Sequence, residues 1–254
     1  MSIPVTVLVS ALDEEERLPG ALASVEGWAE EILVVVDPRT KDRSREIAAG
    51  TGARVLEHPF ESSGAQSNWG IERCRTDWVF VLDADERVTS RLKDAIRLAI
   101  PAPAHAAYAV RRINFAFGRP LRFGDWGSDE IVRLIDRRQA SFVERAVHGA
   151  VTAPSVGRLR GAVEHHTLQS LAQYLPKLND YALRGAADLL AAGRKSTLLG
   201  AVMHAKWRFV RSFVVRLGFL DGAVGFVVAG LAAYGTFLKW AVVWESSTQR
   251  RPRS

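Results

Sequence analysis

Cysteine is almost absent from this chain, because Cys74 is the single one among 254 residues. One cysteine excludes an internal disulfide framework and a cysteine-rich zinc module, and it is consistent with a reducing compartment. Disorder and low complexity are excluded for the chain as a whole, since 48% of its residues are hydrophobic and 24% are charged. The length fits one large domain, or one domain with an appendage.

The N-terminus lacks the features of a targeting signal. Residues 1–4 carry no basic side chain, and the apolar run at 5–9 is soon followed by four consecutive acids at 13–16. We therefore interpret the run as a first β-strand. The part of the chain that follows it is expected to stay in the cytoplasm.

Acidic residues are scarce in the last third of the chain. Residues 166–254 hold four acids against twelve lysines and arginines, whereas residues 1–165 hold 24 acids against 22 basic residues. This difference predicts two roles on one chain, the second of them carried by a basic segment.

Strand and helix patterns alternate through the first half. Short apolar runs predict strands at 4–10, 31–37, 54–56 and 78–82, with helices after the first of them and at 41–52 and 65–75. The alternation predicts βαβ units and a parallel, doubly wound α/β sheet. Further strands are predicted at 108–113, at 131–135 and near 147–148, an aromatic and glycine-rich loop at 115–127, and a helix from 167 to 192.

Acidic residues follow three of these strands: Asp13, Asp37, and the pair Asp83 and Asp85. Open α/β sheets bind ligands beyond the carboxyl ends of their strands. Turn and helix-capping roles explain Asp13 and Asp42 equally well. The pair behind a buried strand needs a counter-ion, and two carboxylates there can reach a divalent cation and a ribose hydroxyl. Such hard oxygen ligands suit Mg²⁺ or Mn²⁺ bridging nucleotide phosphates.

The rear part combines long apolar runs with arginine. Residues 222–238 carry no charge, but this segment is slightly short for a membrane span. Residues 207–216 mix arginines with aromatics, as an interfacial helix does. We favour attachment to a membrane surface with shallow insertion, aided by the basic tail at 250–253. A buried helical hairpin and an oligomer contact are the alternatives. Nucleic-acid binding is disfavoured, because the basic residues are interleaved with apolar ones.

Several motifs in fixed order resemble glycosyltransferase family 2, whose fold is GT-A. They are the blocks 7–15, 31–44 and 78–86. Later features resemble the branch of lipopolysaccharide-core glucosyltransferase-like proteins: Trp126-Gly127-Ser128-Asp129 with Arg133-Leu134, Val147-His148, and Leu220-Asp221-Gly222 with Gly225. The resemblance extends to about Glu245 and implies a catalytic domain at 1–165, a membrane-associating helical region at 166–246 and a basic tail at 247–254.

The resemblance also implies roles for single residues. Asp129 aligns with the general base of inverting members, and its alternative is a structural partner of Arg133. Asp85 matches the metal ligand. His148 matches a further metal contact, and a core histidine is the alternative for it. The implied donor-binding residues are Asp13, Asp37 (nucleotide base), Gln66, Asn68, Asp83 (ribose) and Trp126. Trp126 and Trp69 are candidates for stacking on sugar rings, and a role as packed aromatics is the alternative for both. The chain departs from the pattern at Asp13, Ser67 and Gly149, where relatives usually have Asn, a basic residue and Glu.

The implied activity is metal-dependent, inverting transfer of a sugar from a nucleotide-sugar, most simply a UDP-sugar, in cell-envelope or lipopolysaccharide biosynthesis. Mg²⁺ or Mn²⁺ is the implied cofactor, and the implied acceptor is a lipid-linked glycan at the inner leaflet of the cytoplasmic membrane. Two alternatives stay open. One is a polyprenyl-phosphate sugar synthase with Arg111-Arg112 or Arg137-Arg138 at the acceptor phosphate, and the other is a non-catalytic membrane-binding scaffold.

Overall fold

The computed structural model describes residues 2–127, 129–144 and 150–249. The chain divides into two compact units. Unit 1 consists of Met1–Arg112 and Asp129–His165, and unit 2 of Ile113–Ser128 and His166–Ser254. Unit 2 thus takes up a segment of the predicted catalytic range, 113–128. The assignment of a catalytic and a membrane-associating region stays a prediction.

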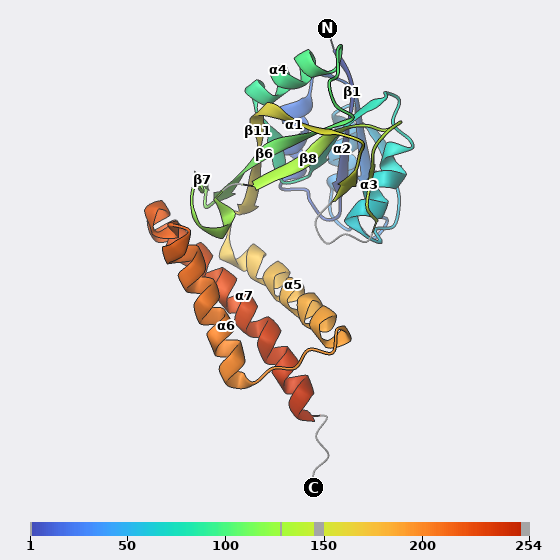
Figure 1. The fold of residues 1–254 in the computed structure, drawn as a ribbon. Coiled ribbons are helices and arrows are strands. Elements are labelled where there is room, and N and C mark those ends of the chain that lie inside the picture. The colour runs from blue at the N-terminus through green and yellow to red at the C-terminus, as the bar shows by residue number, and fades with distance from the viewer. Residues whose placement is uncertain (1, 128, 145–149, 250–254) are drawn as a thin grey trace. The chain divides into compact units, whose positions relative to one another are not determined.

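Unit 1 is built on a twisted sheet whose first half is parallel (Figure 1). Its strands lie in the order β3 (Arg54–Glu57), β2 (Ala29–Val36), β1 (Ile3–Ala11) and β4 (Trp78–Asp83). The connecting helices are α1 (Leu18–Val25), α2 (Ser44–Gly50) and α3 (Ser63–Ile71). This order confirms the predicted α/β class with helices flanking the sheet.

The sheet continues beyond β4 with antiparallel pairs and is therefore mixed. Strand β8 (Asp129–Asp136) pairs with β4 and with β6 (Ala107–Ala116), and β11 (Val156–Leu168) pairs with β5 (Glu86–Val88). Helix α4 (Ser90–Ala99) follows β5, and the short strands β9 (Ser141–Phe142) and β10 (Val151–Thr152) form a separate pair. The antiparallel strands lie beside the acidic end of β4.

Strand β1 shows why the central strands read as nearly continuous apolar runs. Val7 and Val9 pack into the core on one face of the sheet, and Leu8 packs into the core on the other. Alternate residues of a strand point to opposite faces, so a strand covered on both sides must be apolar throughout. The predicted apolar face of α1, which includes Leu18 and Leu22, is fully buried on the first of these cores.

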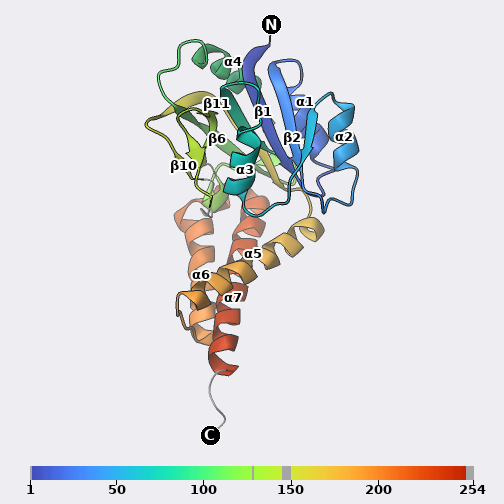
Figure 2. The same cartoon turned by 90° about the vertical axis from the view of Figure 1, so that its right-hand side faces the viewer.

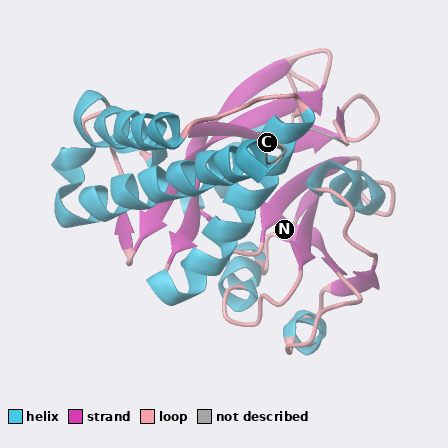
Figure 3. Cartoon of the chain, turned by 90° about the horizontal axis from the view of Figure 1, so that it is seen from below, coloured by secondary structure: helices cyan, strands magenta, loops and turns pink. Residues whose placement is uncertain are grey.

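Unit 2 is largely helical. It contains α5 (Leu171–Ala191), α6 (Leu198–Val210), a π-helical turn at Arg211–Val215, a 3-10 turn at Gly218–Asp221 and α7 (Gly222–Gln249), as well as β7 (Arg119–Pro120) and the 3-10 turn η1 (Gly124–Trp126). Helices α6 and α7 pack along each other, and α5 packs against α7 (Figures 2 and 3).

One helix within the described part of the chain is long and apolar enough to cross a membrane. It covers Gly218–Thr248, and 28% of its most apolar window is buried. A core helix of this length would be mostly buried, because apolar surface exposed to water is unfavourable. By length and composition the helix is therefore a candidate membrane span, with Phe226 and Tyr234 among its exposed side chains.

Candidate active site

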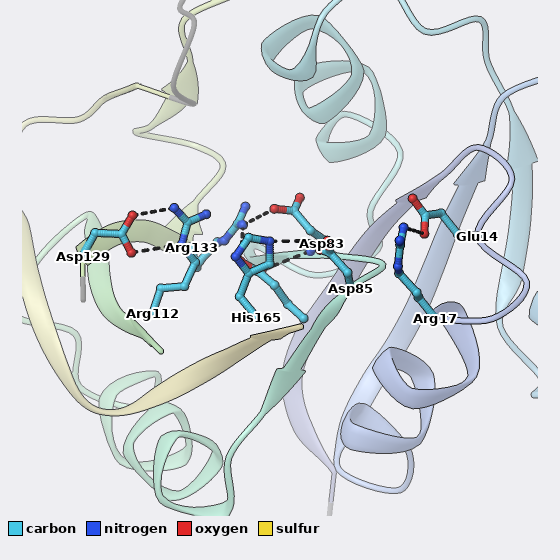
Figure 4. A network of polar contacts seen from close by, with 9 residues as sticks. Glu14, Arg17, Asp83, Asp85, Arg112, Asp129, Arg133 and His165 are labelled. Carbon is cyan, nitrogen blue, oxygen red and sulfur yellow. Dashed lines mark hydrogen bonds and ion pairs between the residues drawn. The ribbon is translucent and has the colours of Figure 1, made fainter. Parts of the chain in front are cut away.

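The two acids behind β4 lie at the edge of the sheet where the parallel strands end (Figure 4). The Asp83 side chain is 50% exposed and that of Asp85 is 23% exposed, whereas Ala84 between them is buried. Ala84 and Asp85 lie in the turn between β4 and β5, where Ala84 packs into the core. Both carboxylates are therefore accessible to a ligand.

Arg133 of β8 supplies a counter-ion for the acids. Its Nη2 donates to Asp83 and also to Glu86 Oε1, at 2.7 Å. Glu86 is fully buried and in turn accepts from the Asp83 backbone N–H at 3.2 Å. Burial raises the pKa of Glu86, and the charge of Arg133 opposes that effect. The counter-ion that the sequence led us to expect is thus partly a residue of the chain itself.

His165 of β11 contacts the second acid. Its Nε2 lies 3.4 Å from Asp85 Oδ2. The antiparallel register sets this position, because His165 pairs with Glu86, one residue after Asp85. Burial disfavours the charged imidazole, but the hydrogen bond and charge of Asp85 outweigh it and raise the pKa of His165.

Sequence reasoning missed His165 because it did not recognise β11. The polar–apolar alternation Arg158-Leu159-Arg160 was the available signal, and Gly161 interrupts it. Gly161 has φ +102°, and a Cβ there would lie 2.4 Å from the Leu92 backbone nitrogen. The glycine lets β11 pass close to the start of α4, which obscures the strand period.

The donor set at this edge fits a divalent cation that is shared with a substrate. Asp85 and His165 provide one carboxylate and one imidazole, while the described residues include no cluster of three such side chains able to hold a metal alone. Mg²⁺ and Mn²⁺ at phosphate-transfer sites commonly use one or two protein ligands and complete their shell with water and phosphate oxygens. The predicted ligand His148 lies outside the described residues.

Asp37 sits at the end of β2 and is 1% exposed. Arg39 donates to both of its oxygens, from Nε at 2.9 Å and from Nη2 at 2.6 Å, and the Phe60 N–H donates at 2.8 Å. These hydrogen bonds, chiefly those from Arg39, hold the pKa of Asp37 well below its usual range despite burial. The Arg39 side chain is 64% exposed and that of Asp37 only 2%, and contact of Asp37 with a nucleotide base stays a prediction.

Three other predicted donor residues make hydrogen bonds within unit 1. Asp13, with φ +53°, accepts from the Lys41 N–H at 2.7 Å and so joins the loops after β1 and β2. Gln66 Oε1 lies 2.8 Å from His58 Nδ1. Asn68 donates to and accepts from the backbone of Phe142, at 2.8 and 2.9 Å. Their contact with a donor stays a prediction.

Asp129 begins β8 and pairs with Arg112 of β6, not with Arg133. Its Oδ1 accepts from Arg112 Nε at 3.0 Å, and its Oδ2 from Nη2 at 2.5 Å. The two residues are register partners across the strands, whereas residues 129 and 133 lie about 13 Å apart along one extended strand. The alternative that Asp129 pairs with Arg133 is therefore wrong, and its role as a base stays a prediction.

The two tryptophans considered for sugar stacking both have protein neighbours. Trp126, in unit 2, packs edge-on against Tyr174 with ring centroids 5.6 Å apart. Trp69 stacks on His58 at 4.3 Å, and the Arg73 guanidinium lies 3.8 Å from its ring centroid. Sugar stacking by either ring stays a prediction.

Replacing Arg133 is expected to destabilise the fold. Arg133→Met removes the cation from the fully buried Glu86 and should lower the free energy of unfolding by about 3 to 5 kcal/mol. Urea unfolding measures the change. Arg158→Met is the matched control, because Arg158 is 78% exposed in its pair with Glu130, and it should cost at most about 1 kcal/mol. Equal losses in the two variants would contradict a stabilising role for the buried pair.

Comparison with known proteins gives the following similarities. Residues 6–160 match the family described as glycosyl transferase family 2. An uncharacterized glycosyltransferase of Rickettsia bellii is 27% identical over 98% of this chain and 88% of its own length. The lipopolysaccharide core biosynthesis glycosyltransferase LpsC of Rhizobium meliloti is 24% identical over 96% of this chain and 93% of its own.

A solved structure is also similar in part. It is glucosyl-3-phosphoglycerate synthase from Mycobacterium tuberculosis in complex with Mn²⁺, uridine diphosphate and phosphoglyceric acid. The TM-score is 0.35 and the identity 19%, covering 45% of this chain and 43% of that one.

Proposed function

The chain belongs to glycosyltransferase family 2 and transfers a sugar from a nucleotide-sugar, and we propose that the donor is a UDP-sugar, that the transfer inverts the anomeric centre and that the acceptor is a lipid-linked glycan of the cell envelope. One observation carries the proposal. Asp83 and Asp85 are accessible at the end of β4, with Arg133 and His165 placed against them. This combination supports a site for the ribose and diphosphate of a nucleotide.

The donor half of the site works by charge and position. Asp37 faces the base once Arg39 moves aside, Asp83 accepts from a ribose hydroxyl, and Asp85 with His165 would hold Mg²⁺ or Mn²⁺. When bound, such an ion offsets negative charge on the departing diphosphate, an effect worth several kcal/mol in the transition state. Arg133 keeps Asp83 in place through their ion pair, so its orientation does not depend on the ligand.

The acceptor half needs a base. As the sugar–phosphate bond breaks, the anomeric carbon develops oxocarbenium character, and the acceptor hydroxyl attacks from the opposite face. Asp129 accepts the hydroxyl proton in this proposal. The Asp129 side chain is 44% exposed. Arg112 must release one oxygen of the Asp129 carboxylate before that oxygen can accept the proton of the acceptor hydroxyl. Arg112 then stays on the other oxygen and orients the acid.

A lipid-linked acceptor is supported by unit 2. Only 28% of the most apolar window of its longest helix is buried, and Phe226 and Tyr234 are exposed, which favours association with a membrane surface. The similarity to LpsC supports a cell-envelope acceptor. The polyprenyl-phosphate alternative stays open, and in the structure Arg112 is bound to Asp129 and Arg138 to Asp136.

A panel of nucleotide-sugars tests the proposal. Purified full-length protein is mixed with UDP-, GDP- and other activated sugars, with Mn²⁺, with Mg²⁺ or with chelator, and release of the nucleotide is measured. We expect slow donor hydrolysis with a UDP-sugar, and its loss on chelation. Folded protein that turns over no nucleotide-sugar, or that prefers a different nucleotide, would overturn the donor assignment.

A further inference from the structure

Unit 2 contains a second cluster of charges, centred on Asp125 of η1. The Asp125 side chain is 3% exposed and contacts three arginines: Arg208 at 3.0 Å, Arg211 at 3.1 Å and Arg216 at 2.9 Å. One carboxylate cannot neutralise three guanidinium groups. The cluster therefore keeps an excess of two positive charges.

The arginines are held by one acid and still reach solvent. The side chains of Arg208 and Arg211 are 34% exposed, and that of Arg216 is 51% exposed. Arg211 Nε is buried and has no hydrogen-bond partner in the part of the chain that the structure describes. Burial lowers the pKa of Arg208, and the charges of Arg211 and Arg216 add to this while Asp125 opposes it. Each guanidinium has five N–H donors, so the cluster offers more donors than Asp125 can accept.

The surrounding turn is fixed by further hydrogen bonds. Asp221 accepts from the backbone N–H of Arg122 and of Phe123, at 3.1 and 2.9 Å. The Gly124 N–H donates to the Arg216 carbonyl at 2.8 Å. Leu217 adopts a left-handed backbone at φ +59°, which turns the chain from α6 toward α7. These bonds hold the backbone of the turn, and Asp125 holds the three arginine side chains.

Exposed apolar side chains flank the arginines along the chain. Between a third and two thirds of each is exposed, and they lie where α6 passes through the turn into α7, in the orange-to-red part of Figure 1: Trp207 (60%), Val214 (52%), Val215 (59%), Leu217 (45%), Phe219 (46%) and Leu220 (54%). Binding of a soluble anion would require only the charged arginine side chains. Apolar groups on the same turn fit the boundary between lipid headgroups and acyl chains.

We propose that Arg208, Arg211 and Arg216 form a binding site for the phosphate of an anionic lipid headgroup, with the apolar side chains of the turn inserted beside it. Arginine recognises phosphate through paired N–H donors, and a positive charge near an anionic membrane surface favours binding. The site deepens the proposed function and rests on its membrane association. It would hold the enzyme at the surface that carries a lipid-linked acceptor.

Vesicle partitioning of the full chain tests the site. Protein is sedimented with phosphatidylcholine vesicles, with or without phosphatidylglycerol. Arg216→Gln should lower partitioning onto the anionic vesicles about fivefold, the effect of one lost charge near the surface. Arg184→Gln is the matched control, because Arg184 is also an exposed arginine of unit 2, paired with Asp180 on α5, and it should change partitioning little. Thermal unfolding verifies that both variants are folded.

Other outcomes would overturn the headgroup site. Equal losses in the two variants would show a diffuse attraction, and unchanged partitioning of Arg216→Gln would exclude the cluster. If inorganic phosphate alone raised the melting temperature of the wild type and not of Arg216→Gln, the site would bind soluble phosphate instead of a lipid. The Asp85→Ala variant should lose sugar transfer but bind vesicles like the wild type. A failure of the catalytic proposal can therefore be distinguished from a failure of the headgroup site.

Discussion

Asp85→Ala is expected to lower metal-stimulated sugar transfer by about three orders of magnitude. The substitution removes the carboxylate that lies 3.4 Å from His165 Nε2, and with it the charge that would hold a divalent ion at the diphosphate. Initial rates with a UDP-sugar, measured over a series of Mn²⁺ concentrations, give the effect. Calorimetric titration of Mn²⁺ in the presence of UDP should show the binding lost as well.

Asp94→Ala serves as its control. Asp94 is an exposed acid of α4, with its side chain 66% exposed in a pair with Arg97. Its removal should leave both rate and metal response unchanged. If Asp85→Ala retained the wild-type rate at saturating Mn²⁺, the acid would not be the metal ligand, and the donor half of the mechanism would have to be reassigned.

Asp129→Asn is expected to lower the turnover number by about 10²- to 10⁴-fold while UDP binding is retained. Asparagine keeps the shape of the side chain and can still accept a hydrogen bond from Arg112, but it cannot take up the acceptor's proton. Turnover with an isolated lipid-linked glycan fraction and UDP affinity by calorimetry separate catalysis from donor binding.

The neighbouring acid provides the comparison for Asp129. Glu130 is 47% exposed and pairs with Arg158, so Glu130→Gln makes the same chemical change one residue away. We expect near wild-type turnover from it. Similar rates for the two variants would mean that Asp129 acts only as the cross-strand partner of Arg112.

The sequence was most informative where a strand is buried on both faces. The runs predicted at 31–37 and 78–82 are found as Ala29–Val36 and Trp78–Asp83, because a strand in the centre of a sheet has to be apolar at every position. Helix α4 and strand β11 were not predicted. The polar side chains of β11 and its glycines at 157 and 161 hide the strand period.

The site was predictable only in part for the same reason. The pair Asp83 and Asp85 follows a strand that the pattern identifies, so its place at the sheet edge was expected. Arg133 and His165 come from strands far along the chain, and their contacts depend on antiparallel pairing that composition does not reveal. Pairing between β6 and β8 likewise determines the partner of Asp129.

Strand β8 carries both Asp129 and Arg133, and its register with β6 shifts between them, because Ala109 pairs with Val132 and Tyr108 pairs with Leu134. Sliding this strand by a single residue against β4 would turn both side chains to the opposite face at once. The acid proposed for the acceptor and the cation that holds Asp83 are therefore gained or lost together. An insertion before β8 is tolerated only if the preceding loop accommodates it without changing the register of the strand. A deletion that shifted the register would remove both the proposed base and the cation that holds Asp83.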